Sequence, residues 1–218
     1  PPNFTFADAP DISRSREFVG YAGLNVALFD GRLRNRFAYA HTDIQRHNID
    51  PTLVPETTFL STGRAARLEY QGILDVSDGV QLSAGVERET TRSRTAFPSP
   101  FDPDPVPSRG RARLTSIYGQ LIVSPVSSLT LIGGVRHDHH SVFGNATTFS
   151  ASAAWSPNDG ATRLRASYGE GFNAPTLFQL LSDFGNTQLR PETAKSWDIG
   201  VEQHLLEGRV VAGLAYFQ

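Results

Sequence analysis

Apolar and polar residues alternate one by one along most of this chain, and this alternation constrains the fold more than any other feature of the sequence. In residues 162–172, Leu164, Ala166 and Tyr168 alternate with two arginines and a serine, and a similar pattern recurs in residues 196–205. A period of two is that of a β-strand with one apolar and one polar face. The sequence therefore predicts an all-β fold.

The same pattern, divided by turn signals, predicts strands that follow one another as antiparallel hairpins. Asp30-Gly31 is a strong hairpin signal because both residue types tolerate the positive φ of a type I′ turn. Residues 176–181 allow one helical turn inside a long connection. Strands are expected at residues 16–29, 32–47, 63–74, 80–95, 111–124, 129–140, 147–156, 161–172, 193–206 and 209–217.

Strand length and loop length both point to a membrane. The expected strands have about nine to fourteen residues, whereas about nine to eleven suffice for a tilted strand to cross a bilayer. Short connections near residues 30, 75, 125, 157 and 207 alternate with long ones near residues 48, 96 and 173 and with one of intermediate length near residue 141. Outer-membrane barrels have this layout, with long loops outside. We therefore expect an antiparallel transmembrane β-barrel.

The composition excludes other classes of protein. Basic residues are spread along the chain and the formal net charge is -2, which argues against a nucleic-acid partner. The absence of cysteine excludes thiolate metal sites. No apolar run is long enough for a membrane helix. Hydropathy alone would suggest a soluble protein, but that measure misses alternating barrel strands.

The charged side of the strands is expected to line a water-filled lumen. A Lys or Arg facing lipid at mid-depth costs about 2–4 kcal/mol, so charge must point inward. Residues 111–124 cannot be assigned, because Ile117 and Leu121 oppose Leu114, Tyr118 and Ile122. The lumen-lining candidates are Arg67, Glu69, Glu87, Arg136, Asp138, Arg163, Arg165, Asp198 and Glu202.

The orientation of the hairpins indicates whether the sequence forms a whole barrel or a part of one. If the long loops face outward, the first expected strand begins outside and the last ends outside. Bacterial barrels that are complete have both ends in the periplasm. We therefore expect residues 1–218 to be part of a larger barrel, with further strands absent from this sequence.

The stretch 167–202 resembles the barrel of TonB-dependent outer-membrane receptors. It has an aromatic-Gly strand end, a Phe-x-Ala-Pro-Thr-Leu loop entry and Gly-Asn-x-x-Leu-x-Pro-Glu before the next strand. Residues 116–144 are similar to the preceding hairpin, and the layout is most like the cobalamin-receptor branch. The matching residues are Phe172, Ala174, Pro175, Leu177, Gly185, Asn186, Leu189, Pro191, Glu192, Ser196, Gly200 and Glu202.

The resemblance implies a barrel of about 22 strands closed by an N-terminal plug, a domain that we expect to be absent from residues 1–218. It implies energised uptake of a scarce, large nutrient, cobalamin or a ferric siderophore, using TonB and the proton-motive force. The expected partners are outer-membrane lipid, TonB and the transported ligand, with no cofactor and no enzymatic activity. Long outer loops would capture the ligand. The loop candidates are Phe97, Phe101, Phe143, Asn145, Phe178, Asp183, Phe184 and Asn186.

Several alternatives stay open. The loop aromatics are explained equally well by packing of the loops on one another. The run His137-Asp138-His139-His140 would place only two imidazoles on one strand face, so no metal site is predicted. A passive porin-type channel and a soluble all-β binding or adhesin module are the competing functions. A hydrolase centred on residues 138–141 is a more distant one.

Overall fold

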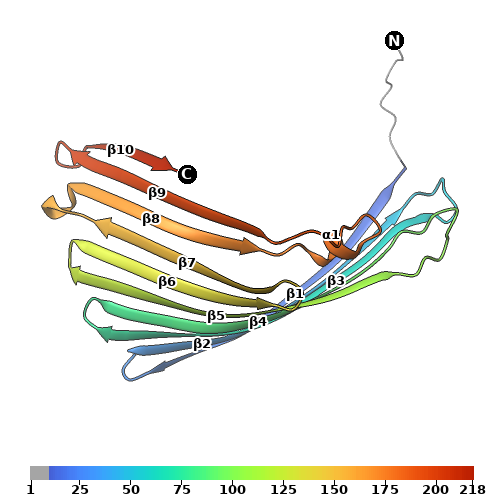
Figure 1. Ribbon diagram of the computed structural model, residues 1–218, viewed down its shortest axis with the longest axis horizontal. Coiled ribbons are helices and arrows are strands. Elements are labelled where there is room, and N and C mark those ends of the chain that lie inside the picture. The colour runs from blue at the N-terminus through green and yellow to red at the C-terminus, as the bar shows by residue number, and fades with distance from the viewer. Residues whose placement is uncertain (1–9) are drawn as a thin grey trace, which may run out of the picture.

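The computed structural model describes residues 10–218 as one antiparallel sheet of ten strands, in which each strand pairs with its neighbours in sequence. The prediction of an all-β, antiparallel meander is confirmed. Figure 1 shows a strongly curved single layer, with the short turns at one end and the long connections at the other. The strands are β1 (Ile12–Leu28), β2 (Leu33–Ile49), β3 (Thr57–Ser77), β4 (Val80–Ala96), β5 (Ser108–Val126), β6 (Leu129–His140), β7 (Gly144–Trp155), β8 (Thr162–Asn173), β9 (Glu192–Leu205) and β10 (Val210–Phe217).

The end of the sheet with the short turns is called the turn end, and the opposite end is called the outer end. Three turns share one backbone conformation, with positive φ at three successive residues of which the last is glycine. In the first, Phe29, Asp30 and Gly31 have φ values of 53°, 54° and 87°. The tight turn is thus centred on Phe29-Asp30, one residue before the predicted Asp30-Gly31 pair, because Gly31 provides the third left-handed position. Residues 158–160 and 206–208 repeat this geometry.

The strands near the N-terminus are longer than predicted. β3 has 21 residues and β5 has 19, and the connections that follow β2 and β4 are correspondingly shorter than predicted. The ladder continues outward through polar residues: Ser61 pairs with Arg46 on one side and with Thr95 on the other. Alternation of apolar residues stops before hydrogen bonding does, so the sequence pattern detects only the apolar part of each strand.

The register defines two faces, because directly paired residues of neighbouring strands share a side of the sheet. Leu68 pairs with Tyr39 on β2, and Val86 of β4 pairs with Tyr70 and with Ile117. We call this side the apolar face and the other side the polar face. β5 is thereby assigned: Ile117 and Leu121 lie on the apolar face, while Leu114, Tyr118 and Ile122 lie on the polar face.

Neither face is covered by a second layer. Among the described residues only Ala38, Ala96, Leu177 and Leu180 form a buried apolar core. Large side chains of the apolar face stay open, among them Leu68 (60% exposed) and Ile117 (62%). An exposed apolar surface of this extent requires an apolar partner, because soluble monomers rarely tolerate one.

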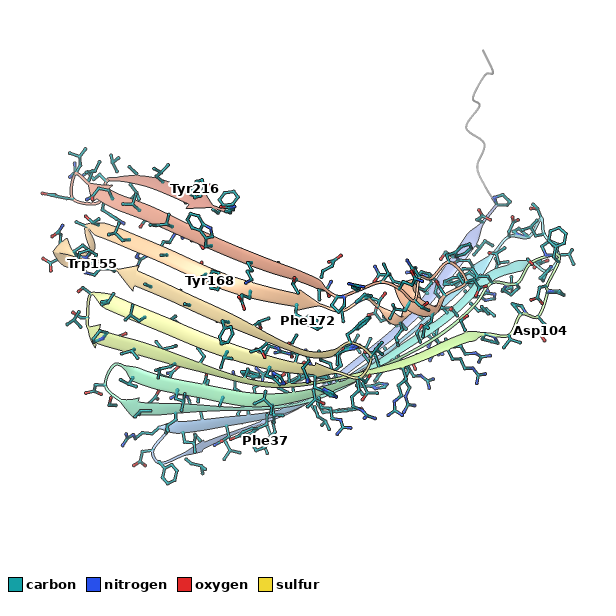
Figure 2. All side chains as sticks on the ribbon, viewed as in Figure 1. Phe37, Asp104, Trp155, Tyr168, Phe172 and Tyr216 are labelled. Atoms are coloured by element: carbon teal, nitrogen blue, oxygen red, sulfur yellow. The ribbon has the colours of Figure 1, made fainter. Side chains whose placement is uncertain are left out.

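Aromatic side chains occur at two levels of the apolar face (Figure 2). Trp155 lies beside the turn end, at the end of β7. Tyr168 of β8 pairs with Trp197 of β9, whose ring lies 5.3 Å from that of Tyr216. Trp155 and Trp197 thus both lie on the apolar face, and aromatic residues of this kind form belts at membrane–water interfaces. No helix within residues 10–218 is long and apolar enough to cross a membrane.

The helix α1 (Leu177–Leu181) lies at the outer end, inside the last long connection (Figure 1). Thr176 is its N-cap, and a capping box joins the side chains and backbones of Thr176 and Gln179. A Cβ on Gly110 of β5 would come 2.6 Å from Leu181 and 3.1 Å from Leu177, so the helix rests directly on the sheet. Gly110 lies on the polar face, and the predicted helical turn therefore folds back over this face.

Candidate functional site

The charged residues predicted to line a lumen all lie on the polar face. Arg67 of β3 pairs with Glu89 of β4, and Glu69 pairs with Glu87. The remaining members follow the same side of the sheet along β6, β8 and β9, where Arg163 pairs with Glu202. The nine residues are Arg67, Glu69, Glu87, Arg136, Asp138, Arg163, Arg165, Asp198 and Glu202.

Arg136 is the centre of a network that joins β4, β5 and β6. Its Nε donates to Asp138 Oδ1 at 2.9 Å, and its Nη2 donates to Ser116 Oγ at 2.7 Å. Glu87 Oε1 lies 4.0 Å from Arg136 Nη2 and 3.9 Å from Arg67 Nη1. Ser116 is fully buried and Asp138 is 6% exposed, so these polar groups depend on Arg136 for a partner.

The polar face of β8 and β9 is held by different contacts. Ser167 donates a short hydrogen bond to Asp198 across the strand pair. A Cβ on Gly200 would lie 2.8 Å from Arg165 Nε, so the arginine lies along the sheet rather than standing away from it. Glu202 Oε1 lies 3.0 Å from His204 Nε2, although its paired neighbour in the register is Arg163.

At the outer end, three of the loop candidates form one aromatic cluster. The ring centroid of Phe97 lies 4.9 Å from that of Phe59 and 5.0 Å from that of Phe184. Phe178 of α1 meets Phe59 edge-on at 6.3 Å. Sequence reasoning missed Phe59, because residues 48–62 were expected to be a loop, whereas Phe59 belongs to β3. The signal available was the high β-propensity of the threonines and the phenylalanine in residues 57–62.

Two cavities lie on either side of the start of α1, over the polar face. The larger, about 730 Å³, is lined by Phe59, Phe97 and Phe178, with Arg46 of β2 at its wall. The second, about 550 Å³, is lined by Arg136, Asp138, His140 and Phe172. Thr91, Thr176 and Leu177 line both cavities, so the aromatic cluster and the Arg136 network border one continuous region.

The remaining candidates in the long connections do not belong to the aromatic cluster. Phe101 is 99% exposed and lies outside the aromatic cluster. Asp183 accepts a hydrogen bond from Ser108 Oγ of β5 at 3.3 Å, which ties the last connection to the sheet. The Asn186 side chain accepts from the backbone of Gln188 at 2.9 Å and thus shapes its own loop.

The third outer connection, between β6 and β7, differs from the prediction. A loop at residues 141–146 was expected, but β7 already begins at Gly144 and leaves a connection of residues 141–143. Asn145 is therefore a strand residue on the apolar face, where its Oδ1 lies 2.7 Å from His139 Nδ1. Phe143 packs against His140 with ring centroids 5.1 Å apart. The loop was overestimated because Asn and Gly are typical turn residues.

The histidine run, residues 137–140, forms the outer end of β6. His137 and His139 share the apolar face and each contacts a β7 side chain, Thr147 or Asn145. Asp138 and His140 point to the polar face. Across residues 10–218, no three His, Asp or Glu side chains converge in a way that would hold a metal ion.

A meander of long strands with one apolar and one charged face is the architecture of a transmembrane β-barrel wall. The family model described as TonB dependent receptor-like, beta-barrel, matches residues 1–218. The chain belongs to this family of outer-membrane receptors and transporters, which is not a family of enzymes.

Solved structures of similar fold include three siderophore receptors. The siderophore receptor PirA from Pseudomonas aeruginosa aligns with a TM-score of 0.73 at 19% identity, over 95% of this chain and 39% of its own. The ferric enterobactin receptor PfeA from Pseudomonas aeruginosa gives 0.75 at 18% identity, over 94% and 35%. The ferric-catecholate import receptor Fiu from E. coli K12 gives 0.72 at 14%, over 95% and 41%. The chain thus spans well under half of each. Membership of the cobalamin branch stays a prediction.

Proposed function

We propose that residues 1–218 form part of the wall of a larger outer-membrane barrel that takes up a scarce, large nutrient, a ferric siderophore or cobalamin. The observation that carries this proposal is the pair of cavities over the polar face, which join an aromatic cluster at the outer end to the Arg136 network deeper in the wall. Such a region offers a bulky ligand first stacking surface and then charge.

The aromatic cluster supports a capture role. Phe178 and Phe184 are 45% and 81% exposed although each contacts another ring, so aromatic surface remains open to a ligand. Rings provide contact area with little loss of conformational entropy, and apolar pockets with a few polar groups are typical ligand sites. The candidates that we propose for first contact with the ligand are Phe97, Phe178, Asp183 and Phe184.

The polar face supports a passage rather than a packed core. Charged residues of both signs occur along it, and Arg67, Glu87 and Arg136 approach one another within salt-bridge distance. In a closed barrel this face would enclose water, and the lumen-lining role of the nine charged candidates follows from that closure. Energy for transport would come from TonB acting through a plug domain of the complete protein.

The decisive experiment is uptake in cells that carry the complete protein. We expect accumulation of ⁵⁵Fe supplied as a ferric siderophore, or of labelled cobalamin, and we expect it to stop when TonB is deleted or a protonophore is added. Uptake that persists after both treatments would identify the competing function, a passive channel. Partition of the protein into buffer without detergent would favour the soluble binding module.

Ligand capture can be tested separately from energised transport. Phe97→Ala and Phe178→Ala should each weaken binding of the transported ligand to cells kept at 0 °C, because each removes a ring from the cluster. Phe29→Ala is the matched control: Phe29 is also exposed, at 72%, but lies in a tight turn at the opposite end of the sheet. Equal binding by all three variants would remove the aromatic cluster from the proposal.

A further inference from the structure

The apolar face becomes strongly basic toward the outer end. Beyond its band of aliphatic and aromatic residues, this face of β3, β4 and β5 carries a series of exposed arginines. These arginines were not among the predicted site residues, because they interrupt the apolar alternation that marks the strands. We call them the arginine belt, which consists of Arg64, Arg88, Arg92, Arg94, Arg109 and Arg111.

The belt places like charges side by side. Arg64 pairs directly with Arg92 in the register, and Arg92 pairs with Arg111. One residue pair farther out on this face, Arg94 lies opposite Arg109. Like charges directly opposite each other destabilise a sheet. The arrangement therefore needs negative charge from another source.

The described part of the chain supplies little of that charge. Asp43 of β2 accepts from Arg64 Nε at 2.6 Å, and no other belt residue forms a salt bridge within residues 10–218. Glu87 and Glu89 of β4 point to the polar face. His41, His137 and His139, which share the apolar face with the belt, add no negative charge.

An apolar groove ends at the belt. A groove of about 550 Å³ in the apolar face is lined by Leu24, Phe37, Tyr39, Leu68 and Val86, with Arg88 at its outer limit. Arg88 pairs directly with Leu68, so the change from aliphatic to basic takes place within one ladder step. A surface that is apolar along its length and cationic at one end matches an acyl chain with an anionic head group.

The basic surface continues above the groove. A second cavity on the same face, about 460 Å³, is lined by Arg14 and Arg16 of β1, by Arg94, and by prolines of the connection that follows β4. Asp104 of that connection also lines it and is its acidic member. Figure 2 shows Asp104 at the outer end, far from the turns. The positive charge therefore extends outward from the membrane border.

We propose that the groove and the arginine belt bind a phosphorylated, acylated lipid of the outer leaflet, with an acyl chain along Leu68 and phosphate on Arg88, Arg92 and Arg111. Guanidinium groups bind phosphate through paired, charge-assisted hydrogen bonds and are less costly to remove from water than ammonium groups. Basic clusters at a membrane border attract anionic head groups. This inference rests on the proposed membrane placement of the apolar face but is independent of the transported ligand.

The test uses the complete protein in neutral detergent, with diphosphorylated lipid A as the probe and its dephosphorylated form as the comparison. Native mass spectrometry or a fluorescent lipid A competition assay gives the affinity. We expect tight binding of lipid A and weak binding of the dephosphorylated form. Arg92→Gln combined with Arg111→Gln should weaken lipid A binding by ~10-fold or more, since each cation near a charged surface contributes about 1 kcal/mol.

The matched control is Arg190→Gln combined with Arg209→Gln, which removes the same charge from exposed connections away from the belt. Equal effects of the two double variants, or equal affinity for both forms of lipid A, would overturn the proposal. Inhibition by inorganic phosphate as strong as that by lipid A would overturn the lipid assignment in favour of a simple anion site. Insertion into phosphatidylcholine vesicles is measured in parallel, because failure there would instead refute the membrane placement.

Discussion

Arg136 and Asp138 belong to the same strand and the same face, and the guanidinium Nε of the first donates to the carboxylate of the second at 2.9 Å. The same guanidinium reaches Ser116 on the neighbouring strand, and it lies 5.9 Å from the ring centroid of Tyr118. One side chain thus provides partners for groups on two strands and approaches Glu87 on a third.

Replacing Arg136 should therefore destabilise the wall. Arg136→Met leaves the buried Ser116 and Asp138 groups without their donor, at a cost of about 1–3 kcal/mol for each unsatisfied group. Urea unfolding in detergent micelles measures the change. Asp138→Asn in the Arg136→Met background should recover part of the loss, because the unpaired carboxylate is then neutral. Purely additive effects of the two substitutions would show that the pair is not coupled.

Gly85 is a position where the sheet has room only for hydrogen. An added Cβ would lie 2.4 Å from the Tyr118 ring on the polar face and 2.7 Å from the carbonyl oxygen of Tyr70. Gly85→Ala should lower the unfolding free energy by about 1–3 kcal/mol, because the ring and backbone must move. Gly133→Ala is the control, since an added Cβ there meets nothing within 4 Å. Similar unfolding curves for both variants would contradict this packing.

Whether the apolar face meets lipid can be tested by introducing a lysine on either face of the sheet. Leu121→Lys places an ammonium group within the apolar band, between Leu82 of β4 and Gly133 of β6, and should reduce the stability of the protein in lipid vesicles by about 2–4 kcal/mol. Ser83→Lys puts the same charge on the polar face of β4 and should have a much smaller effect. Tryptophan fluorescence during titration with urea gives both values. A larger penalty at Ser83 would reverse the assignment of the faces.

The turns with three positive φ values depend on their glycine. Gly31 has a φ of 87° and open space around its Cα, so a substitution there is limited by backbone conformation alone. Gly31→Val should cost about 1–2 kcal/mol, because the left-handed region is unfavourable for a branched side chain. Gly31→Asn should be milder, since asparagine tolerates this region. Thermal unfolding of the two variants compares them directly, and equal losses would point to another cause.

Asp50 gives a prediction for pH in the connection between β2 and β3. The hydroxyl of Thr52 donates to its carboxylate at 2.6 Å and the amide of Thr52 at 2.9 Å, and these bonds hold the pKa of Asp50 below its usual value. A lowered folded-state pKa stabilises the turn above the unfolded pKa, and this contribution is lost as the pH falls through the folded value. Thr52→Val should raise the pKa of Asp50 toward its usual value in a carboxylate NMR titration, whereas Thr58→Val should not.

Much of this architecture can be predicted from the sequence. Alternate residues of a barrel strand face lipid and water, so apolar and polar residue types alternate along it. The side on which Arg67, Arg165 and Asp198 lie was predictable, since each has aliphatic or aromatic neighbours before and after it. The turn positions were predictable from Gly, Asp and Pro. The faces of β5 were not predictable, because Leu114, Tyr118 and Ile122 place apolar side chains on the polar face as well. The pairing of Tyr118 with Gly85 and Arg136 assigns them.

The outer end was predicted less well for a physical reason. There both faces meet polar surroundings, so a strand such as β3 continues without an apolar stripe and Phe59 was placed in a loop. Asn145 was placed in a loop for its turn propensity, although pairing with His139 extends β7. The meeting of Phe97 with Phe184 depends on how two distant connections fold back, which no local pattern encodes.

The strict succession of β1 to β10, each bonded only to its sequence neighbours, has a consequence for how such a wall can grow or shrink. Removing two adjacent strands together leaves every later residue oriented as before. Removing one would turn all that follow inside out and send each loop to the wrong compartment. Duplication or loss in multiples of a hairpin is therefore the route by which the circumference can change.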